Sequence, residues 1–358
     1  MRLLFYISTI RGGGAARVMT NLANQFVQDK NEVYFVTNFP SEEEYFLEEK
    51  VVRYSLEKVE SKANPLVKNY KRISLLRNIV KEVSPDIVVS FMHENDVRAY
   101  AATRGLNTKL LLSVRNDPAK LYKAKMKAKI ARFVYGHADA VVFQTDDAKA
   151  WFGTIRGQSK VIYNQVAPVF YQVGRNAKDC RDIVTTGKFM SQKNHKMLMQ
   201  AFCMIAEEID DNLIIYGDGK LRGEYEEFIK ANNMQERIFI PGNCSHVAET
   251  IAKNKLFVMS SDYEGMPNSL MEAMAVGMPC ISTDCPCGGP KELSGQADSV
   301  ELVGVGDVNN LAEKMKLMLM SDDYAEKKAS LAKQRAEEFK PEIIYCQWKD
   351  YISEIIGK

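Results

Sequence analysis

The sequence has no long hydrophobic run, and its cysteines form no recognisable framework. No apolar stretch approaches the roughly 18 to 20 residues that span a bilayer. The opening segment MRLLFYIST is short, and no small-residue cleavage pattern follows it, so we expect a buried first strand and no signal peptide. The seven cysteines are scattered through 358 residues, which predicts free thiols in a reducing cytosol. Together these absences predict a cytoplasmic protein.

Charge is unevenly distributed along the chain. The net charge is +2, but residues 1–167 carry +9 and residues 168–358 carry −7. A basic first half implies an anionic neighbour, such as nucleic acid, a phosphorylated substrate or a membrane surface. The sequence holds no recognised nucleic-acid-binding module, so we do not expect nucleic acid as a partner.

Acidic residues are absent from one stretch, residues 118–138, which carries six lysines and arginines with apolar residues interleaved. As a helix this stretch would be basic and partly amphipathic, a pattern typical of helices that lie on anionic membranes. The residues expected to face the membrane are Lys120, Lys123, Lys127 and Arg132. An ordinary solvated helix face fits the same pattern.

Short apolar runs alternate with helical patterns in both halves of the chain. The runs with strand character are 3–8, 32–37, 86–91, 109–114 and 138–144, then 183–186, 212–216, 237–241, 255–259, 279–283 and 300–303. Such alternation predicts an α/β protein with two Rossmann-like, doubly wound parallel sheets.

The predicted domain borders follow from breaks in this pattern. We expect a first domain over residues 1–167, a second over 168–340, and a helix over 341–358 that crosses back to the first domain. Ligands of doubly wound sheets bind beyond the carboxyl ends of the strands, which predicts a ligand cleft with the two domains facing across it.

The strongest motif is SDYEGMPNSLMEAMAVGMP, at residues 261–279. It follows an apolar strand and leads into a helix that Pro267 can open, whose first amides suit a diphosphate. Gly265 lets the loop approach a ligand closely. Glu264 precedes the helix and Glu272 lies about one turn inside it, so the two carboxylates can reach different parts of one extended ligand. An alternative explains the same spacing: Glu264 is an acid that favours the helix dipole, and Glu272 is a solvated glutamate on the helix.

The spacing Glu-x7-Glu within EGMPNSLMEAMAVGMP closely resembles the signature of glycosyltransferase family 4, whose members are retaining enzymes of the GT-B fold. The resemblance extends over most of the chain in the same order. It implies that Glu272 binds the ribose hydroxyls of a nucleotide and that Glu264 contacts the transferred sugar and assists the reaction. The remaining donor contacts would come from Gly265, Met266, Pro267, Asn268 and Ser269.

Two lysines occupy the segment TGKFMSQKNH, at residues 186–195. Lys188 and Lys193 flank a loop after a strand and can grip both phosphates of a leaving diphosphate, which gains negative charge as the glycosidic bond breaks. The segment resembles the family's Arg and Lys pair, with Lys188 where arginine is usual. Because lysine makes no bidentate fork, we expect a weaker or differently shaped contact there. Two solvated surface lysines are the alternative.

A glycine-rich loop, RGGGAARV at residues 11–18, follows the first expected strand. Gly13 and Gly14 let the backbone approach a phosphate or an acceptor, and we assign both to the donor-binding residues. A dinucleotide fingerprint would need glycine where Arg17 stands, and the second strand lacks the ribose-binding acid, which disfavours a dehydrogenase. The loop better resembles the family's GGxE-R loop, although Ala16 replaces its glutamate. A plain strand-to-helix turn also fits.

Other loops supply weaker candidates. Arg115 and Asn116 stand where many relatives carry a histidine, and either can contact sugar, phosphate or acceptor; a capped turn before the next proline fits equally well. His93 and Asn95, which follow an earlier strand, are candidates of the same kind. Gly217, in the segment YGDG, resembles the family's glycine turn and adds to the donor site.

No two aspartates lie two positions apart, so the sequence has no Asp-x-Asp motif. Glycosyltransferases of the other major fold class usually hold a divalent metal on that motif. Lys188, Lys193 and helix-terminal amides can replace the metal, so we expect no metal and no cofactor. Cys285 and Cys287 have no second Cys or His pair near them in sequence and are expected to be structural thiols.

The family resemblance implies transfer of a hexose or N-acetylhexosamine from a UDP-sugar, with retention of configuration. The expected acceptor is a saccharide, in many relatives a lipid-linked one used for surface polysaccharide. The enzyme would then associate peripherally with the inner face of the cell membrane. A UDP-sugar 2-epimerase of the same architecture and a non-catalytic sugar- or membrane-binding protein remain alternatives.

Overall fold

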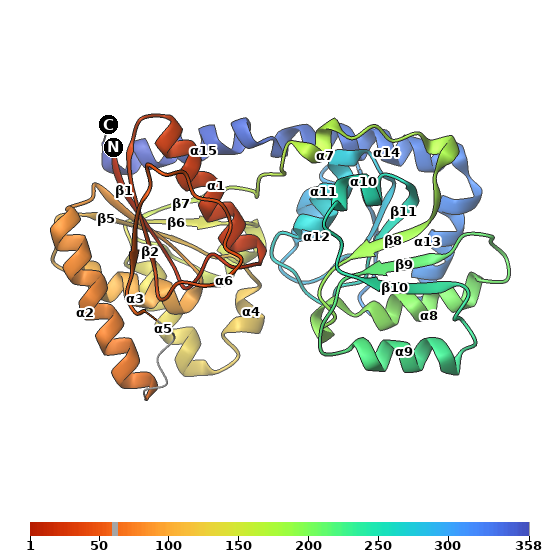
Figure 1. Ribbon diagram of the computed structural model, residues 1–358, viewed down its shortest axis with the longest axis horizontal. Coiled ribbons are helices and arrows are strands. Elements are labelled where there is room, and N and C mark those ends of the chain that lie inside the picture. Colours follow the sequence, from red (N-terminus) through yellow and green to blue (C-terminus); the bar gives the residue numbers. More distant parts are fainter. Residues whose placement is uncertain (59–63, 358) are drawn as a thin grey trace. The chain divides into compact units, whose positions relative to one another are not determined.

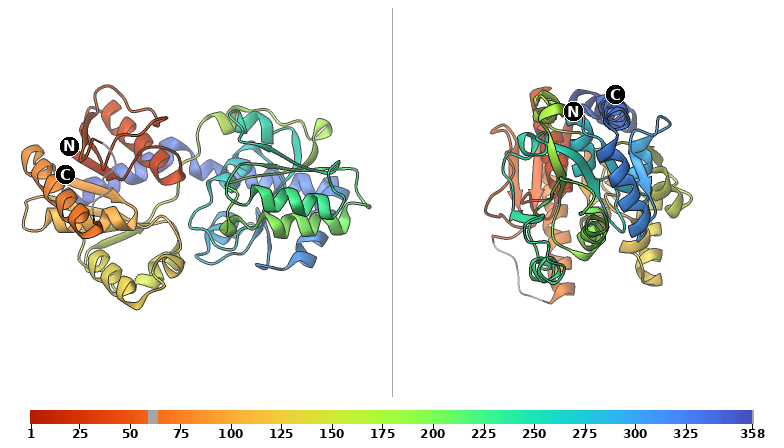
Figure 2. Two further views of the ribbon diagram at one scale, coloured as in Figure 1. Left: turned by 60° about the horizontal axis from the view of Figure 1, so that its bottom comes forward. Right: turned by 90° about the vertical axis from the view of Figure 1, so that its right-hand side faces the viewer.

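The computed structural model describes residues 1–58 and 64–357. The chain divides into two compact units. Unit 1 consists of residues 1–164 together with 344–358, and unit 2 consists of residues 165–343. Each unit has its own parallel sheet with helices on both faces (Figures 1 and 2).

The described part of unit 1 forms a seven-stranded parallel sheet in the order β3-β2-β1-β4-β5-β6-β7. Its strands are β1 Arg2–Ile7, β2 Glu32–Thr37, β3 Val52–Ser55, β4 Ile87–Phe91, β5 Lys109–Ser113, β6 Ala140–Phe143 and β7 Gln158–Val161. The sequence did not predict β3 and β7. Both are edge strands with largely exposed side chains, so they contain no apolar run.

The helices of unit 1 cover this sheet and include one from the end of the chain. They are α1 Gly14–Gln28, α2 Pro65–Val83, α3 His93–Thr103, α4 Pro118–Leu121, α5 Lys125–Gly136, α6 Asp146–Phe152 and, from residue 344 onward, α15 Pro341–Ile356. The apolar face of α15 is buried in the core of unit 1, where the ring of Trp348 lies 5.7 Å from that of Phe91. The Tyr345 hydroxyl donates to Asp29 Oδ2 at 2.7 Å and ties α15 to the end of α1.

The basic stretch 118–138 is not one helix, which corrects the sequence prediction. It forms α4 and α5, and the helix is broken at residues 122–124. The break buries Tyr122, whose ring lies 4.6 Å from the ring of His93 and 5.3 Å from that of Trp151. Burial of this large aromatic side chain explains the interruption better than local helix propensity does.

Unit 2 contains a six-stranded parallel sheet in the order β10-β9-β8-β11-β12-β13. Its strands are β8 Arg181–Thr186, β9 Leu213–Tyr216, β10 Ile238–Gly242, β11 Asn254–Met259, β12 Cys280–Thr283 and β13 Glu301–Val303. Its α-helices are α7 Val169–Gln172, α8 His195–Ile205, α9 Arg222–Ala231, α10 Val247–Ile251, α11 Asn268–Val276, α12 Gly289–Ser294, α13 Val308–Met320 and α14 Asp322–Ala336. Short 3-10 turns are Ala177–Asp179, Ser191–Lys193 and Glu337–Phe339.

Both sheets reverse their strand order at one point, between β1 and β4 in unit 1 and between β8 and β11 in unit 2. This doubly wound topology confirms the predicted fold class. Ligands of such sheets bind beyond the carboxyl ends of the strands at the reversal point. In each unit, a ligand site is therefore expected at the two loops that follow the strands on either side of the reversal point.

Candidate active site

In unit 2, the loop after β8 and the loop after β11 are joined by three hydrogen-bonded pairs. Three consecutive residues of the first loop bond three consecutive residues of the second. The pairs are Gln192 Nε2 to the Tyr263 carbonyl at 2.9 Å, Lys193 Nζ to Glu264 Oε1 at 2.7 Å, and Asn194 Nδ2 to Asp262 Oδ1 at 2.7 Å. The reversal point of this sheet thus carries one rigid polar assembly formed by both loops.

Glu264 is held at the centre of this assembly. The residue is 7% exposed, and one carboxylate oxygen accepts hydrogen bonds from Lys193 and from the Ser261 hydroxyl, the latter at 2.8 Å. A buried carboxylate needs such partners, because an unpaired charge in this environment is strongly unfavourable. The two bonds therefore fix both the position and the orientation of Glu264.

The helix α11 begins directly after this loop, at Asn268, with Pro267 in the N-cap position. Its first amides have no partner within the helix and form an anion-binding end. Glu272 lies about one turn inside the helix and is only 7% exposed, which excludes the alternative of a solvated helix glutamate. The backbone of Gly265 packs so closely on the next loop that a Cβ at Gly289 would lie 1.8 Å from its carbonyl oxygen.

The loop after β8 carries Lys188 and Lys193 and is called the lysine-bearing loop. Gly217 lies in a third loop, the one after β9, which packs against the lysine-bearing loop. Its φ is +146°, and a Cβ there would lie 1.9 Å from the carbonyl oxygen of Gly187. Gly187 in turn donates its N–H to the Tyr216 carbonyl at 2.9 Å. Only glycine fits this close approach of two backbones, so Gly217 determines where the lysine-bearing loop lies.

The two predicted phosphate-binding lysines differ in their surroundings. Lys188 is exposed, while Lys193 is half-buried and paired with Glu264. The aliphatic stem of Lys193 lies over Gly187, with its Cδ 3.6 Å from the position of a Cβ there. An ammonium group has three donors, so the ion pair leaves Lys193 able to bind a phosphate as well. Phosphate contact by these lysines remains a prediction.

His195 lies beneath the lysine-bearing loop and is a packing residue. It is 2% exposed, and its ring lies 5.5 Å from the ring of Phe189 and 5.8 Å from that of Tyr225. Burial, with a smaller effect of the nearby Lys193 charge, lowers the pKa of His195 to about 3. The imidazole is therefore neutral near pH 7 and adds no charge to the site.

The reversal point of unit 1 contains a cavity of about 570 Å³. The cavity brings together the glycine-rich loop, the start of α3 and the loop after β5. The sequence-predicted residues that line it are Gly13, Gly14, His93, Asn95, Arg115 and Asn116. Candidates from three separate segments therefore line one pocket. In the sequence, the one feature that they share is a position after a predicted parallel strand.

Asn95 and Asn116 have structural roles in this cavity. Asn95 Oδ1 accepts hydrogen bonds from the Ser8 hydroxyl at 2.8 Å and from Arg98 Nη1 at 3.1 Å, and its amide donates to the Phe91 carbonyl. Asn116 Oδ1 accepts from the N–H of its neighbour Asp117 at 2.8 Å, so the capped-turn alternative describes that loop. Of the four acceptor candidates, His93 and Arg115 are better placed to contact a ligand.

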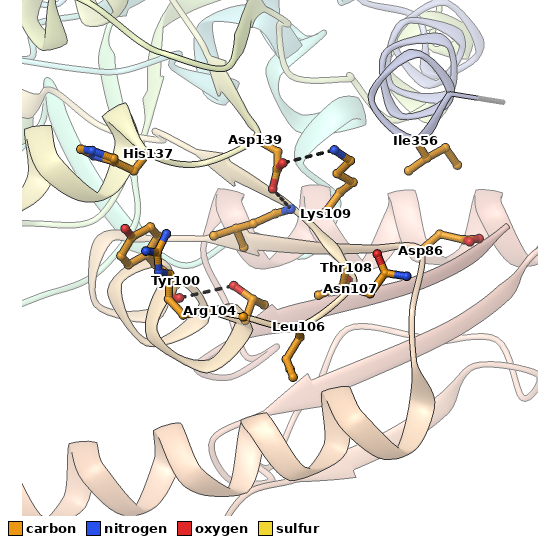
Figure 3. Close-up of a pocket in the computed structure, with 13 residues that line it drawn as sticks. Asp86, Tyr100, Arg104, Leu106, Asn107, Thr108, Lys109, His137, Asp139 and Ile356 are labelled. Atoms are coloured by element: carbon orange, nitrogen blue, oxygen red, sulfur yellow. Dashed lines mark hydrogen bonds and ion pairs between the residues drawn. The ribbon is translucent and has the colours of Figure 1, made fainter.

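A second cavity of unit 1, of about 480 Å³, lies at the amino ends of the strands, where β5 begins (Figure 3). Its Asp139 carboxylate accepts from the Leu110 N–H at 2.9 Å and from Lys109 Nζ at 3.4 Å (Figure 3). None of the predicted site residues lines it. Its place at the amino ends of the strands makes it the weaker candidate.

Two family models match the chain, and each match lies mostly or wholly in one unit. The model described as Glycosyltransferase Family 4 matches residues 12–168, and the model described as Glycosyl transferases group 1 matches residues 180–321. The chain belongs to the family 4 glycosyltransferases. The two matched ranges of the glycosyltransferase contain the joined loops of unit 2 and most of the residues that line the cavity of unit 1.

Full-length relatives agree with this assignment. An alpha-1,4-N-acetyl-D-galactosaminyltransferase of Campylobacter jejuni, named for an undecaprenol-linked saccharide, is 26% identical over 363 residues and covers 99% of both chains. A 4-alpha-N-acetylgalactosaminyltransferase of the same organism, also named for an undecaprenol-linked substrate, is 25% identical over 357 residues, covering 94% of this chain and 95% of the relative.

Solved structures show the fold of the glycosyltransferase. The HepE protein of Anabaena, crystallised in complex with UDP, has a TM-score of 0.79 at 16% identity and covers 99% of this chain and 100% of its own. At this identity the likeness supports the GT-B fold and nothing finer.

The basic residues expected to face a membrane have different environments in the glycosyltransferase. Lys120 and Lys123 are exposed. Lys127 also lines the cavity of unit 1. Arg132 lies over the ring of Trp151, 4.5 Å from its centroid, and donates to the Trp151 carbonyl, so its charge is engaged within unit 1. Membrane contact by Arg132 is thus the weakest of the four predictions.

Several residues that hold the two sites of the glycosyltransferase had no role predicted from the sequence. Ser261 and Asp262 lie within the strongest motif, but only the folded loops show that they fix Glu264 and Asn194. Asp96 is fully buried and bonded to the Tyr135 hydroxyl at 2.5 Å. The available signal for Asp96 was its position three residues after His93, on one face of a helix that follows a strand.

Two further features are absent from the described residues, 1–58 and 64–357. Within them no helix has both the length and the apolar composition that a membrane crossing requires. The same residues hold no group of three His, Cys, Asp or Glu side chains arranged for a metal ion. Cys285 is 1% exposed, and burial raises the pKa of its thiol to about 12.

Proposed function

We propose that this glycosyltransferase moves a hexose or N-acetylhexosamine from a UDP-sugar to a lipid-linked saccharide acceptor, with retention of configuration, in bacterial surface-polysaccharide synthesis. The names of the two Campylobacter relatives, which specify undecaprenol-linked saccharides, support the acceptor class. The complex of the similar HepE fold with UDP supports the donor class.

The observation that carries this proposal is the fixed position of Glu264 beside the start of α11. In the proposed reaction the bond between the sugar C1 and the UDP oxygen breaks, and its electron pair leaves with the diphosphate. The acceptor oxygen forms the new bond to C1, and its proton is taken up by the departing diphosphate. Glu264 orients the donor sugar, while Lys188, Lys193 and the α11 amides stabilise the charge that develops on UDP. Glu272 binds the ribose hydroxyls.

We further propose that the reaction needs no divalent metal. Lysine ammonium groups and helix-terminal amides supply the positive potential that a cation would otherwise provide at a diphosphate. Lys193 is already placed by Glu264, so this part of the potential is preorganised and needs no rearrangement when the diphosphate departs.

A panel of nucleotide sugars tests the donor and the reaction class. We expect slow release of UDP from one UDP-hexose or UDP-N-acetylhexosamine without acceptor, and faster release when a crude lipid-linked saccharide fraction is added. Nuclear magnetic resonance of the anomeric proton would show whether configuration is retained. Conversion of a UDP-sugar to its 2-epimer without acceptor would instead establish the epimerase alternative, and inertness toward every nucleotide sugar would favour a binding protein.

Peripheral membrane association is proposed from the exposed face of α5. Met126, Ile130 and Phe133 recur at helical spacing and are 67%, 43% and 53% exposed. Exposed lysines accompany them at positions 123, 125 and 129. An apolar strip flanked by lysines suits an anionic bilayer surface, into which the apolar side chains insert while the ammonium groups contact lipid phosphates.

Removing these charges should release the protein from anionic vesicles. At about 1 kcal/mol for each lysine near the surface, the variant K123Q/K125Q/K129Q should lose roughly a hundredfold in affinity for vesicles containing phosphatidylglycerol. The variant K220Q/K230Q/K253Q removes three exposed lysines from unit 2 and serves as the control of equal charge. Vesicle sedimentation measures both. Equal losses for the two variants, or equal binding of wild type to neutral vesicles, would contradict docking through α5.

A further inference from the structure

Arg115 lines the cavity of unit 1, and its two terminal nitrogens have no hydrogen-bond partner among the described residues. Arg115 lies over the ring of Phe91, with its guanidinium carbon 4.3 Å from the centroid. Its Nη1 and Nη2 atoms are both buried, and neither has a hydrogen-bond partner among the described residues. A buried guanidinium normally makes several hydrogen bonds, and leaving its donors unmade is unfavourable. A ligand that accepts hydrogen bonds from these two nitrogens would remove this unfavourable state.

In the described part of the chain, the acid whose charge acts on Arg115 is Asp96, which is buried. No ion pair joins the two side chains within 4 Å among the described residues, and Asp96 Oδ2 accepts a hydrogen bond from the Tyr135 hydroxyl. Burial raises the pKa of Asp96 well above its usual range and so favours its neutral form. Burial lowers the pKa of Arg115 to about 9 against the opposing charge of Asp96, so the guanidinium stays charged near pH 7.

Other groups that line the same cavity also favour a negative ligand. The helix α1 begins there at Gly14, has no acid in its first turn, and has an N-cap, Gly13, that no described side chain caps. Its first amides therefore present the positive end of a 15-residue helix to the cavity. Lys127 lines the cavity as a second cation.

Neutral polar groups complete the lining. His93 Nδ1 and the Ser113 hydroxyl oxygen are buried and have no hydrogen-bond partner among the described residues. Burial lowers the pKa of His93, so it is mainly uncharged near pH 7 and can donate or accept a hydrogen bond. A ligand that carries hydroxyl groups beside an anionic group would satisfy these atoms and Arg115 together.

We infer that this cavity binds an anionic group of the acceptor, a carboxylate or a phosphate attached to a sugar, through the guanidinium of Arg115. The inference rests on the proposed function and deepens it, because it restricts the acceptor to saccharides that carry a negative charge. The planar guanidinium suits both anions, since each offers two oxygens to its paired N–H groups.

Calorimetric binding of three monosaccharide probes tests the inference without any transfer reaction. Glucuronate and glucose 6-phosphate supply the two anions, and glucose supplies the neutral reference. We expect at least one anionic probe to bind about tenfold or more tightly than glucose, since hydrogen bonds to a charged group are stronger than neutral ones. The tighter of the two anionic probes identifies a uronic acid or a sugar phosphate as the source of the charge.

Variants test whether the preference for anionic probes comes from Arg115 itself or from the overall positive charge of the protein. Arg115→Gln should abolish the preference for the anionic probe, Arg115→Lys should restore part of it, and Arg104→Gln, an exposed arginine outside this cavity, should leave it unchanged. If Arg115→Gln fails to fold, Lys127→Gln provides the test, because Lys127 is exposed and its loss should weaken the preference by severalfold.

A repeat of the titration with saturating UDP distinguishes an acceptor site from the phosphate site of the donor. Persistent binding supports the inference, and displacement by UDP overturns it. Equal affinity for glucose and both anionic probes would also overturn it and would leave a cavity filled by water. Because these probes need no donor, a failed donor panel would refute the proposed function without affecting this result.

Discussion

Replacing Glu264 with glutamine should lower the transfer rate by about a hundredfold to a thousandfold, the loss typical when one preorganised electrostatic contact to a transition state is removed. Glutamine keeps the shape of the side chain and can still accept the hydrogen bond from Ser261. It removes the negative charge that is fixed against Lys193. The effect should therefore fall on the chemical step and not on the fold.

UDP binding should behave differently from transfer in this variant. Loss of the ion pair frees Lys193 for the diphosphate, so the affinity of E264Q for UDP should be unchanged or higher. Glu272→Gln should show the opposite behaviour, with UDP bound about tenfold more weakly if its carboxylate holds the ribose hydroxyls. Steady-state rates and calorimetric titration of UDP separate the two roles.

Glu224→Gln is the matched control for both variants. Glu224 is an exposed glutamate of unit 2 that also pairs with a lysine, Lys196, at 3.3 Å. Exposed pairs of this kind contribute at most about 1 kcal/mol, so its loss should change neither transfer nor UDP affinity. Normal transfer by E264Q would show that Glu264 has been assigned the wrong role.

Gly217→Ala should destabilise unit 2 by about 3 kcal/mol or more, because alanine rarely adopts the required backbone conformation and its Cβ has no space. The Cβ would lie 1.9 Å from the carbonyl oxygen of Gly187 and 3.1 Å from the ring of Phe189, so the lysine-bearing loop would have to move. Displacement of this loop should also abolish measurable UDP binding, even where the variant remains folded at low temperature.

Gly223→Ala provides the comparison for this substitution. Gly223 lies in the first turn of α9, and an added Cβ there meets nothing within 4 Å. Alanine is favoured over glycine in a helix, so this variant should be as stable as wild type or more stable by up to about 1 kcal/mol. Urea unfolding and UDP titration measure both variants. Equal stability of the two would contradict the described packing of Gly217 on Gly187.

Sequence periodicity was sufficient to predict the doubly wound sheets. Central strands such as β4 and β11 are buried on both faces and appear as continuous apolar runs. The edge strands β3 and β7 were missed because half or more of their side chains face solvent. The break in helix at Tyr122 was missed as well, because the aromatic partners that bury this ring come from α3 and α6.

The motif in residues 261–279 indicated which segment forms the donor site, and the loops after β8 and β9 were identified by similar motifs. Their mutual contacts had no sequence signal. Lys193 and Glu264 are 71 residues apart along the chain, and only the parallel order of β8 and β11 brings them to 2.7 Å. The unpaired state of Arg115 was likewise hidden, since it depends on where Phe91 and Asp96 are buried.

The central claim is that the joined loops of unit 2 and the start of α11 hold the diphosphate of UDP without a metal ion. Calorimetric titration of UDP into the wild-type protein in excess EDTA tests it most directly, with Lys193→Ala titrated alongside. We predict equal affinity for UDP with EDTA and with added magnesium, and a loss of tenfold or more in K193A, as expected for a charge-assisted contact to phosphate. Binding that disappears in EDTA and returns with magnesium, or that is unaltered in K193A, would contradict the claim.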